Sequence, residues 1–238
     1  MSMTPRSQVL CICLAAIAIC GTADAHNLFV MVEHRSAGPD SIDVIFEHSP
    51  YPGKGTYNKP LLDRGHTWIQ RLNEEELVPL SLNEVSRLGK KFLQAETTTE
   101  SPRAVVHSCK WGVYKGRLDY FHGKYLDVSS AEQFSRLART PKLPLDISPA
   151  IESGEVKITV FFKDKPLAKT AVWRWTPGGK ETKLTTDADG TITVESLAPG
   201  THSFAALHIL EDPSGEFEGE PYQGVMHGTT CSFRWPIK

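Results

Sequence analysis

The residue with the clearest chemical use is His26, because it follows a segment with the features of a secretory signal. Arg6 precedes an apolar run from Val9 to Cys20, and Ala23-Asp24-Ala25 has the small-x-small pattern of a cleavage site. The run has about 12 residues, whereas a helix needs about 20 to span a bilayer. We therefore expect residues 1–25 to be a cleaved signal peptide and His26 to begin a periplasmic or secreted chain.

A histidine at a free N-terminus offers two metal ligands from one residue. An α-amine and an imidazole both lose their protons near neutral pH, and together they can close a chelate ring on one divalent ion. Nitrogen ligands of this kind suit copper, nickel or zinc, and copper is bound most tightly. The alternative is that His26 is only the residue left behind by a permissive cleavage site.

His26 also opens a predicted β-hairpin. Residues 26–34 alternate between two faces, the turn signal Ala37-Gly38-Pro39-Asp40 follows, and residues 41–48 alternate again. With a turn centred near residue 37, opposed residue numbers sum to about 74, which places His48 opposite His26. We predict that the amine, His26 and His48 form a three-nitrogen metal site. An ordinary surface histidine pair is the alternative.

The other histidines in the first half of the chain differ in whether they could bind the same ion as His26. His34 shares the face of His26 but lies about 26 Å away along a strand, so it cannot bind the same ion. His66, His107 and His122 fall on other predicted strands, and any of them could complete the site. Their spacing does not select among the three.

A second histidine cluster is expected towards the C-terminal end. His202 and His208 share one face of a strand, and His227 comes close to His208 if the returning strand pairs with it. A predicted loop between them could gather a hard cation, although a run of charges is usually a solvated surface. The acidic residues of this loop, 211–220, are Glu211, Asp212, Glu216, Glu218 and Glu220.

The elements that must position these histidines are almost all predicted to be strands. We expect an all-β fold of two antiparallel sandwich-like domains with at most one short helix. The predicted parts are an N-terminal domain at 26–140, a proline-rich extended connector at 141–153 and a C-terminal sandwich at 154–238. Within the first domain, the Gly- and Pro-rich segment 50–60 is expected to be an irregular loop. The helix is expected at 131–138, with Ser129 or Ser130 as its N-cap.

Both predicted domains contain short runs with strand composition, and the spacing of these runs suits an antiparallel meander or sandwich. In the first domain, beyond the hairpin, they lie at 67–72, 77–82, 91–95, 104–114 and 117–128. In the second they lie at 156–162, 170–175, 181–185, 190–194, 202–209 and 229–235.

Composition excludes several classes of protein. A hydrophobic content of 40% argues against intrinsic disorder, and a net charge of −2 without a basic cluster argues against nucleic acid as a partner. The chain lacks the sequence motifs of serine hydrolases, zinc proteases, phosphate loops and dinucleotide-binding folds, so we do not expect an enzyme. After signal removal only Cys109 and Cys231 remain, which could form a disulfide or stay as two buried thiols.

Several motifs together resemble one known family. They are the strand start Ala25-His26-Asn27-Leu28-Phe29-Val30, the segment from Leu143 to Pro149, the turn Thr186-Asp187-Ala188-Asp189-Gly190, and Leu197-Ala198-Pro199-Gly200. With these the chain is similar to an exported bacterial family of unknown function, formerly described as the periplasmic component of nickel or cobalt uptake. The C-terminal sandwich resembles the small domains of transthyretin and of carboxypeptidase regulatory regions.

The resemblance implies a function and a partner. It implies binding of nickel, cobalt or copper, with His26 as the carried-over ligand, and delivery of the ion to a membrane transporter. One alternative is a periplasmic or surface interaction module that binds protein or glycan without a metal. A copper oxidase acting on polysaccharide through an N-terminal histidine is a third hypothesis.

Overall fold

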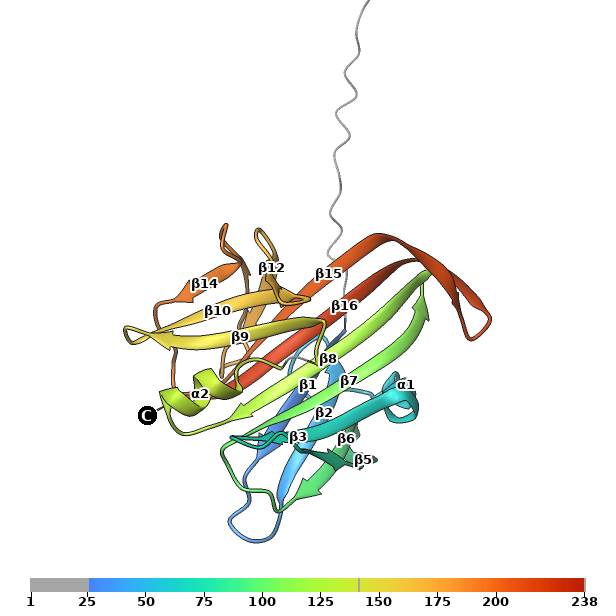
Figure 1. Ribbon diagram of the computed structural model, residues 1–238. Helices are drawn as coiled ribbons and strands as arrows, with labels where there is room; N and C mark the ends of the chain where they lie inside the picture. Colours follow the sequence, from blue (N-terminus) through green and yellow to red (C-terminus); the bar gives the residue numbers. More distant parts are fainter. Residues whose placement is uncertain (1–25, 141, 238) are drawn as a thin grey trace, which may run out of the picture.

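The computed structural model describes residues 26–140 and 142–237. These ranges form three β-sheets and two short helices (Figure 1). The all-β class predicted from the sequence is confirmed. The predicted signal peptide lies outside the described residues. Within the described ranges, neither helix combines the length and the apolar character needed to cross a membrane.

The first sheet contains the predicted hairpin and has the strand order β1-β2-β6-β5. Leu28 and Val30 face the interior, as the alternation of the sequence predicts. The pair Asn27 and Glu47 confirms the expected register. The fourth strand, β5, is not predicted because four of its five residues are exposed and polar. The strands are β1 (Asn27–Glu33), β2 (Asp40–Glu47), β5 (Asn83–Arg87) and β6 (Lys90–Thr97).

The second sheet has eight strands in the order β13-β12-β15-β16-β8-β7-β3-β4. The strands are β3 (Gly65–Arg71), β4 (Leu77–Leu80), β7 (Arg103–Tyr114), β8 (Arg117–Asp127), β12 (Ala171–Trp175), β13 (Glu181–Thr185), β15 (Gly200–Phe217) and β16 (Glu220–Trp235). At its centre β16 pairs with β8 in parallel, from Val225 opposite Leu118 to Phe233 opposite Leu126. Strands from both predicted domains therefore belong to one continuous sheet.

The third sheet corrects the expectation of an extended connector at 141–153. Its strands are β9 (Leu145–Glu152), β10 (Glu155–Phe162), β11 (Lys165–Pro166) and β14 (Thr191–Val194). β9 pairs with β10 along its whole length, and Leu145 and Ile147 are fully buried. Pro149 is tolerated because β9 pairs on one side only, so its missing N–H breaks no ladder. The proline content of this segment suggested a connector, but it is equally compatible with an edge strand.

Two helices are present in the described residues, one more than expected. The predicted helix is α2 (Ala131–Leu137), where Ser130 Oγ accepts a hydrogen bond from the Gln133 amide at 3.3 Å. The other, α1 (Asn58–Arg64), overlaps the end of the segment predicted as an irregular loop. Pro60 lies in its first turn, where a missing N–H disrupts no helical hydrogen bond, and the buried Leu61 anchors it.

Three layers result, with the eight-stranded sheet in the middle (Figure 1). One core lies between this sheet and the first sheet, and includes Leu28, Val44 and Phe121. The other lies between it and the third sheet, and includes Ile158 and Phe204. The middle sheet is thus buried on both faces, so side chains that alternate along its strands enter two different cores.

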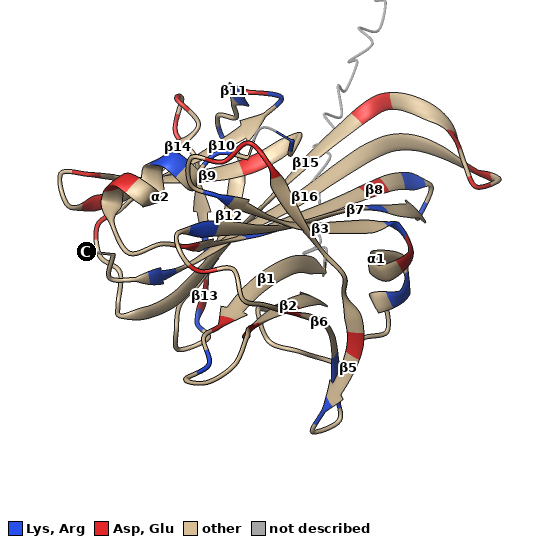
Figure 2. Ribbon diagram, turned by 60° about the horizontal axis from the view of Figure 1, so that its bottom comes forward, with Lys and Arg blue, Asp and Glu red and all other residues tan. Residues whose placement is uncertain are grey.

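The predicted acidic loop at 211–220 is instead the end of a long hairpin arm. β15 and β16 shift register between Leu210 and Ser214, and then pair again as far as Phe217 and Glu220. The arm extends beyond the rest of the sheet in Figure 1, and acidic residues mark its tip in Figure 2. Glu218 Oε2 accepts a hydrogen bond from Arg64 Nη2 at 2.5 Å. This segment forms strands despite its polar composition, because the backbone hydrogen bonds between β15 and β16 resume after the register shift.

Candidate functional site

The hairpin places His26 and His48 in contact. Their ring centroids are 4.1 Å apart, and the carboxylate of Glu47 lies 4.0 Å from His26 Nε2. His26 precedes β1 and His48 follows β2, so the register that pairs Asn27 with Glu47 also sets the two imidazoles side by side. The juxtaposition predicted from the residue numbers is therefore present.

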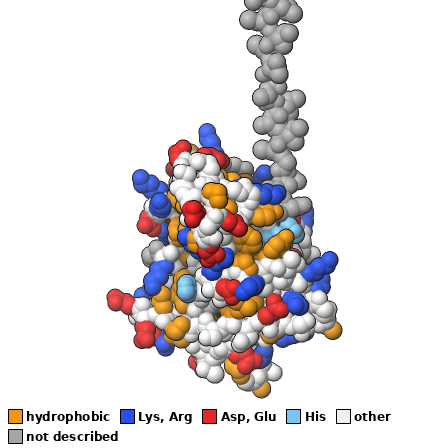
Figure 3. All heavy atoms as spheres, turned by 90° about the vertical axis from the view of Figure 1, so that its right-hand side faces the viewer, with side chains coloured by type: hydrophobic (Ala, Val, Ile, Leu, Met, Phe, Trp, Pro, Cys, Tyr) orange, Lys and Arg blue, Asp and Glu red, His pale blue; other side chains and the backbone are white. Residues whose placement is uncertain are grey.

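Aromatic side chains surround the ring of His26. Tyr57 meets it edge-on at 4.9 Å, Phe46 stacks on it at 5.4 Å, and Trp111 lies 6.1 Å from Tyr57. The side chain of His26 is 24% exposed, whereas His48 is exposed. On the face seen in Figure 3, histidine side chains reach the surface among hydrophobic ones. The aromatic wall restrains one imidazole, while the other stays open to solvent.

Two imidazoles and a carboxylate are the kinds of ligand that a divalent transition metal binds, although their ligand atoms do not all lie within 4.8 Å of one another. Imidazole nitrogen suits copper, nickel and zinc, and a carboxylate would offset part of the charge of the ion. His26 contacts Phe46, Glu47, His48 and Tyr57. Cleavage after Ala25 would add the α-amine of His26 to this set.

His34 lies at the other end of β1, in a different cluster. In the described residues, His34, Asp40 and Asp127 form the group of three potential ligands whose atoms lie within 4.8 Å of one another. However, the fully buried Arg103 already pairs with both carboxylates, at 2.9 Å to Asp127 Oδ2 and 2.5 Å to Asp40 Oδ2. This cluster is an ion-pair network, because a guanidinium occupies the place where a cation would bind.

Two of the three histidines that the sequence offered as further ligands beside His26 have other partners. His107 Nδ1 lies 2.8 Å from Thr67 Oγ1, and burial lowers the pKa of this imidazole to about 3. His122 Nδ1 lies 2.9 Å from Ser108 Oγ, on the face of β8 that turns away from the hairpin. Glu47 is the neighbour that the sequence argument missed, although its position one residue before His48 was a usable signal.

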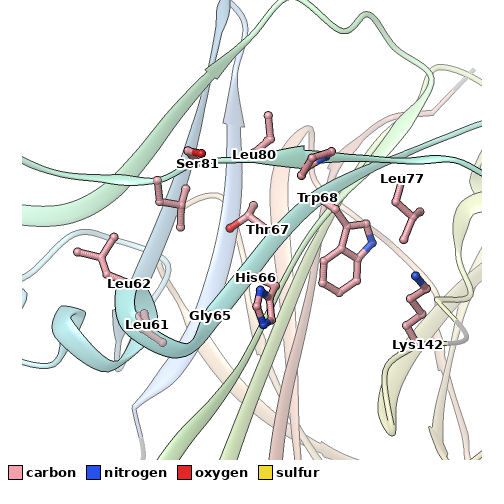
Figure 4. A pocket seen from close by; sticks show the side chains of 12 residues that line it. Leu61, Leu62, Gly65, His66, Thr67, Trp68, Leu77, Leu80, Ser81 and Lys142 are labelled. Atoms are coloured by element: carbon pink, nitrogen blue, oxygen red, sulfur yellow. The ribbon is translucent and has the colours of Figure 1, made fainter.

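His66 lines a cavity of about 630 Å³ beside β3 and β4 (Figure 4). Leu61 and Leu62 of α1 lie at one end of the cavity, and Trp68, Leu77 and Lys142 lie at the other. Its lining comes from residues 61–82 together with residue 142, so no local sequence pattern indicated it. His66, the third histidine among which the sequence could not select, therefore lines a separate cavity.

The two cysteines are free, and they lie in different cores. Cys109 is buried with Phe121 on the hairpin side of the middle sheet, and Cys231 is buried with Phe233 on the opposite side. Burial raises the pKa of each thiol to about 12. Of the two alternatives left open by the sequence, the structure has the buried thiols.

The expected second cluster is only partly formed. His208 and His227 are directly opposite each other in the β15 and β16 ladder. His202 does not join them, because its Nε2 bonds the carbonyl oxygen of Ala198 at 2.8 Å. His122 takes its place: its Nε2 lies 3.5 Å from His227 Nδ1. The sequence could not indicate this contact, since the two residues meet through a parallel strand pairing.

Fold and site together define an all-β, three-layer protein with a histidine pair at the start of its first strand. No protein-family model and no curated protein matches the chain. Among solved structures, the match to the FN1–FN3 domains of chicken CNTN1 covers 87% of this chain and 65% of that one, at 8% identity and a TM-score of 0.21. The match to a pullulanase from Anoxybacillus sp. LM18-11 covers 74% of this chain and 24% of that one, at 12% identity and a TM-score of 0.22. At these TM-scores the two proteins indicate nothing about the function of this chain.

Proposed function

We propose that this chain is an exported protein that binds a divalent transition metal, nickel, cobalt or copper, through its processed N-terminus, His26 and His48. The observation that carries the proposal is the 4.1 Å separation of the two imidazole rings, set by the register of the hairpin. The Glu47 carboxylate beside them adds a negative ligand. Delivery of the ion to a membrane transporter is the role that fits an exported binder with no enzymatic motif.

The test compares two forms of the protein by isothermal titration with nickel and with copper. One form begins at His26, and the other keeps Ala25 in front of it, which turns the amine into a peptide nitrogen. We expect the extended form to bind at least about tenfold more weakly, equivalent to about 1.4 kcal/mol. Equal binding by the two forms would show that the N-terminal chelate is not used.

A pair of matched variants locates the second imidazole. His48→Ala should weaken binding of both ions by about tenfold or more, whereas His34→Ala removes an exposed histidine of the same hairpin and should leave the affinity unchanged. Unchanged binding in His48→Ala would remove this residue from the site. A melting temperature that neither chelator nor added metal alters would favour the interaction module without a metal.

A further inference from the structure

A row of three histidines crosses the face of the middle sheet that packs against the third sheet. His208 on β15 is opposite His227 on β16, and the parallel pairing of β16 with β8 brings His122 beside His227. Phe162 of β10 covers the row, with its ring 4.3 Å from that of His208 and 5.4 Å from that of His227. Three adjacent strands therefore each contribute one imidazole to the same face of the sheet.

The central pair of nitrogens has a separation that suits a shared metal ion. His122 Nε2 and His227 Nδ1 are 3.5 Å apart, which is long for a hydrogen bond, since N–H to acceptor distances cluster near 2.9 to 3.0 Å. Two nitrogens bonded to one metal at about 2.0 Å are about 3.3 Å apart at a tetrahedral angle and about 4 Å apart in line. The observed distance falls between these limits.

A neighbouring hydroxyl sets the orientation of one ring. Ser108 Oγ lies 2.9 Å from His122 Nδ1, and when that nitrogen carries the proton it donates to Ser108 and leaves Nε2 with a free lone pair. Such a hydrogen bond to the second ring nitrogen is the usual support of a metal-binding histidine. Burial lowers the pKa of His122 to about 3 and that of His227 to about 4, so both rings are neutral at pH 7.

Charge around the row selects the kind of ion. Within the described residues, the electrostatic neighbours that act on His122 are His227 and His107, and those that act on His227 are His208 and Lys163. No carboxylate is among them, and the exposed fractions of His122 and His227 are 2% and 7%. A doubly charged ion would be costly to bury without an anionic ligand, because the desolvation cost rises with the square of the charge. A singly charged ion avoids most of this cost.

We propose that His122 Nε2 and His227 Nδ1 bind Cu(I), and that His208 lies beside the path to them at the more exposed end of the row. Two neutral imidazoles satisfy the low coordination number of this ion, and Phe162 covers the row. His208 is half-buried, so it provides the route by which the ion reaches the central pair. This second site is separate from the one proposed at His26 and His48, where a carboxylate is present and divalent ions are expected.

The test uses the processed full chain with His26→Ala and His48→Ala, so that the first site is silent and its failure or success does not bear on the result. Metal-free protein is titrated with Cu(I) under anaerobic conditions against a chromophoric Cu(I) chelator. We expect one Cu(I) per chain, and at least a tenfold loss of affinity in His122→Gln and in His227→Gln. The matched control is His202→Gln, which alters another buried histidine of the same hairpin and should retain binding.

A second measurement needs no substitution in the row, which matters if His122→Gln or His227→Gln fails to fold. In the same background, Ag(I) serves as a monovalent probe that is stable in air, and the imidazole nitrogens are observed by NMR of ¹⁵N-labelled protein. Ag(I) should shift Nε2 of His122 and Nδ1 of His227. Absence of Cu(I) binding in this background, or Ag(I) shifts confined to other histidines, would overturn the proposal.

Discussion

At the scale of single residues, His107 couples stability to pH. Its imidazole is buried beside Thr67, and its pKa falls to about 3, whereas an unfolded chain has a histidine pKa near 6.5. The unfolded state therefore binds a proton that the folded state does not between these two values, and stability falls as the pH drops below about 6.5. From pH 7 to pH 5 this residue alone should cost about 2 kcal/mol.

His107→Gln tests this coupling, because glutamine can keep a hydrogen bond to Thr67 but does not titrate. Urea unfolding at pH 7 and pH 5 should show a difference between the two values that is about 2 kcal/mol smaller in the variant than in the parent protein. Between pH 7.5 and pH 8.5 the two proteins should change in parallel, since the histidine is neutral in both states. An unchanged acid dependence would mean that His107 is protonated in the folded protein.

Cys109 and Cys231 provide a second test at this scale. Because burial raises both thiol pKa values to about 12, neither thiol forms much thiolate at pH 8. Native protein should therefore resist alkylation by iodoacetamide for hours, and unfolding in urea without reductant should expose two reactive thiols. A mass unchanged by iodoacetamide after unfolding would instead indicate the disulfide.

At the scale of elements, local pairings could be predicted and distant ones could not. The contact of His26 with His48 follows from a turn signal and two alternating runs that are adjacent in sequence. The contact of His122 with His227 depends on a parallel pairing that no turn specifies. Pro149 shows a third case, in which one residue type fits both a linker and an edge strand. Local signals thus predicted the contact of His26 with His48, and only the fold revealed the contact of His122 with His227.

An ion-pair network fastens the turn of the first hairpin to the middle sheet. Arg103 of β7, whose side chain is fully buried, joins Asp40 at the start of β2 to Asp127 at the end of β8. Asp127→Asn would leave this guanidinium short of one charge partner, and breaking a buried pair in this way costs about 3 to 5 kcal/mol. Urea unfolding should show this loss. The control Asp63→Asn breaks an exposed pair with Lys59 and should cost about 0.5 kcal/mol or less; equal losses would mean that the network contributes no more than a surface pair.

At the scale of the whole molecule, the shared sheet connects the two predicted domains. β8 from the first and β16 from the second form a central parallel pair, and Thr230 of β16 also donates a hydrogen bond to the carbonyl oxygen of Leu28 in β1. Each half supplies strands that cover the other. The composition change at 141–153 marked a boundary in sequence, but the hydrogen-bonding pattern continues across it.

Separating the chain at this boundary should therefore prevent folding of the first part. Residues 26–140 alone would expose β8 as an unpaired edge and lose the third sheet that covers Ala104, Val106 and Leu126. We expect no cooperative thermal transition for this fragment, and one transition for residues 26–238 whether followed by tryptophan fluorescence or by circular dichroism. A short Gly-Ser insertion at the turn between Pro177 and Gly179 is the control, and should leave that single transition in place. A cooperative transition in the fragment would show that the N-terminal part is an independent domain, because a half-sheet that folds alone does not need β16 to close its edge.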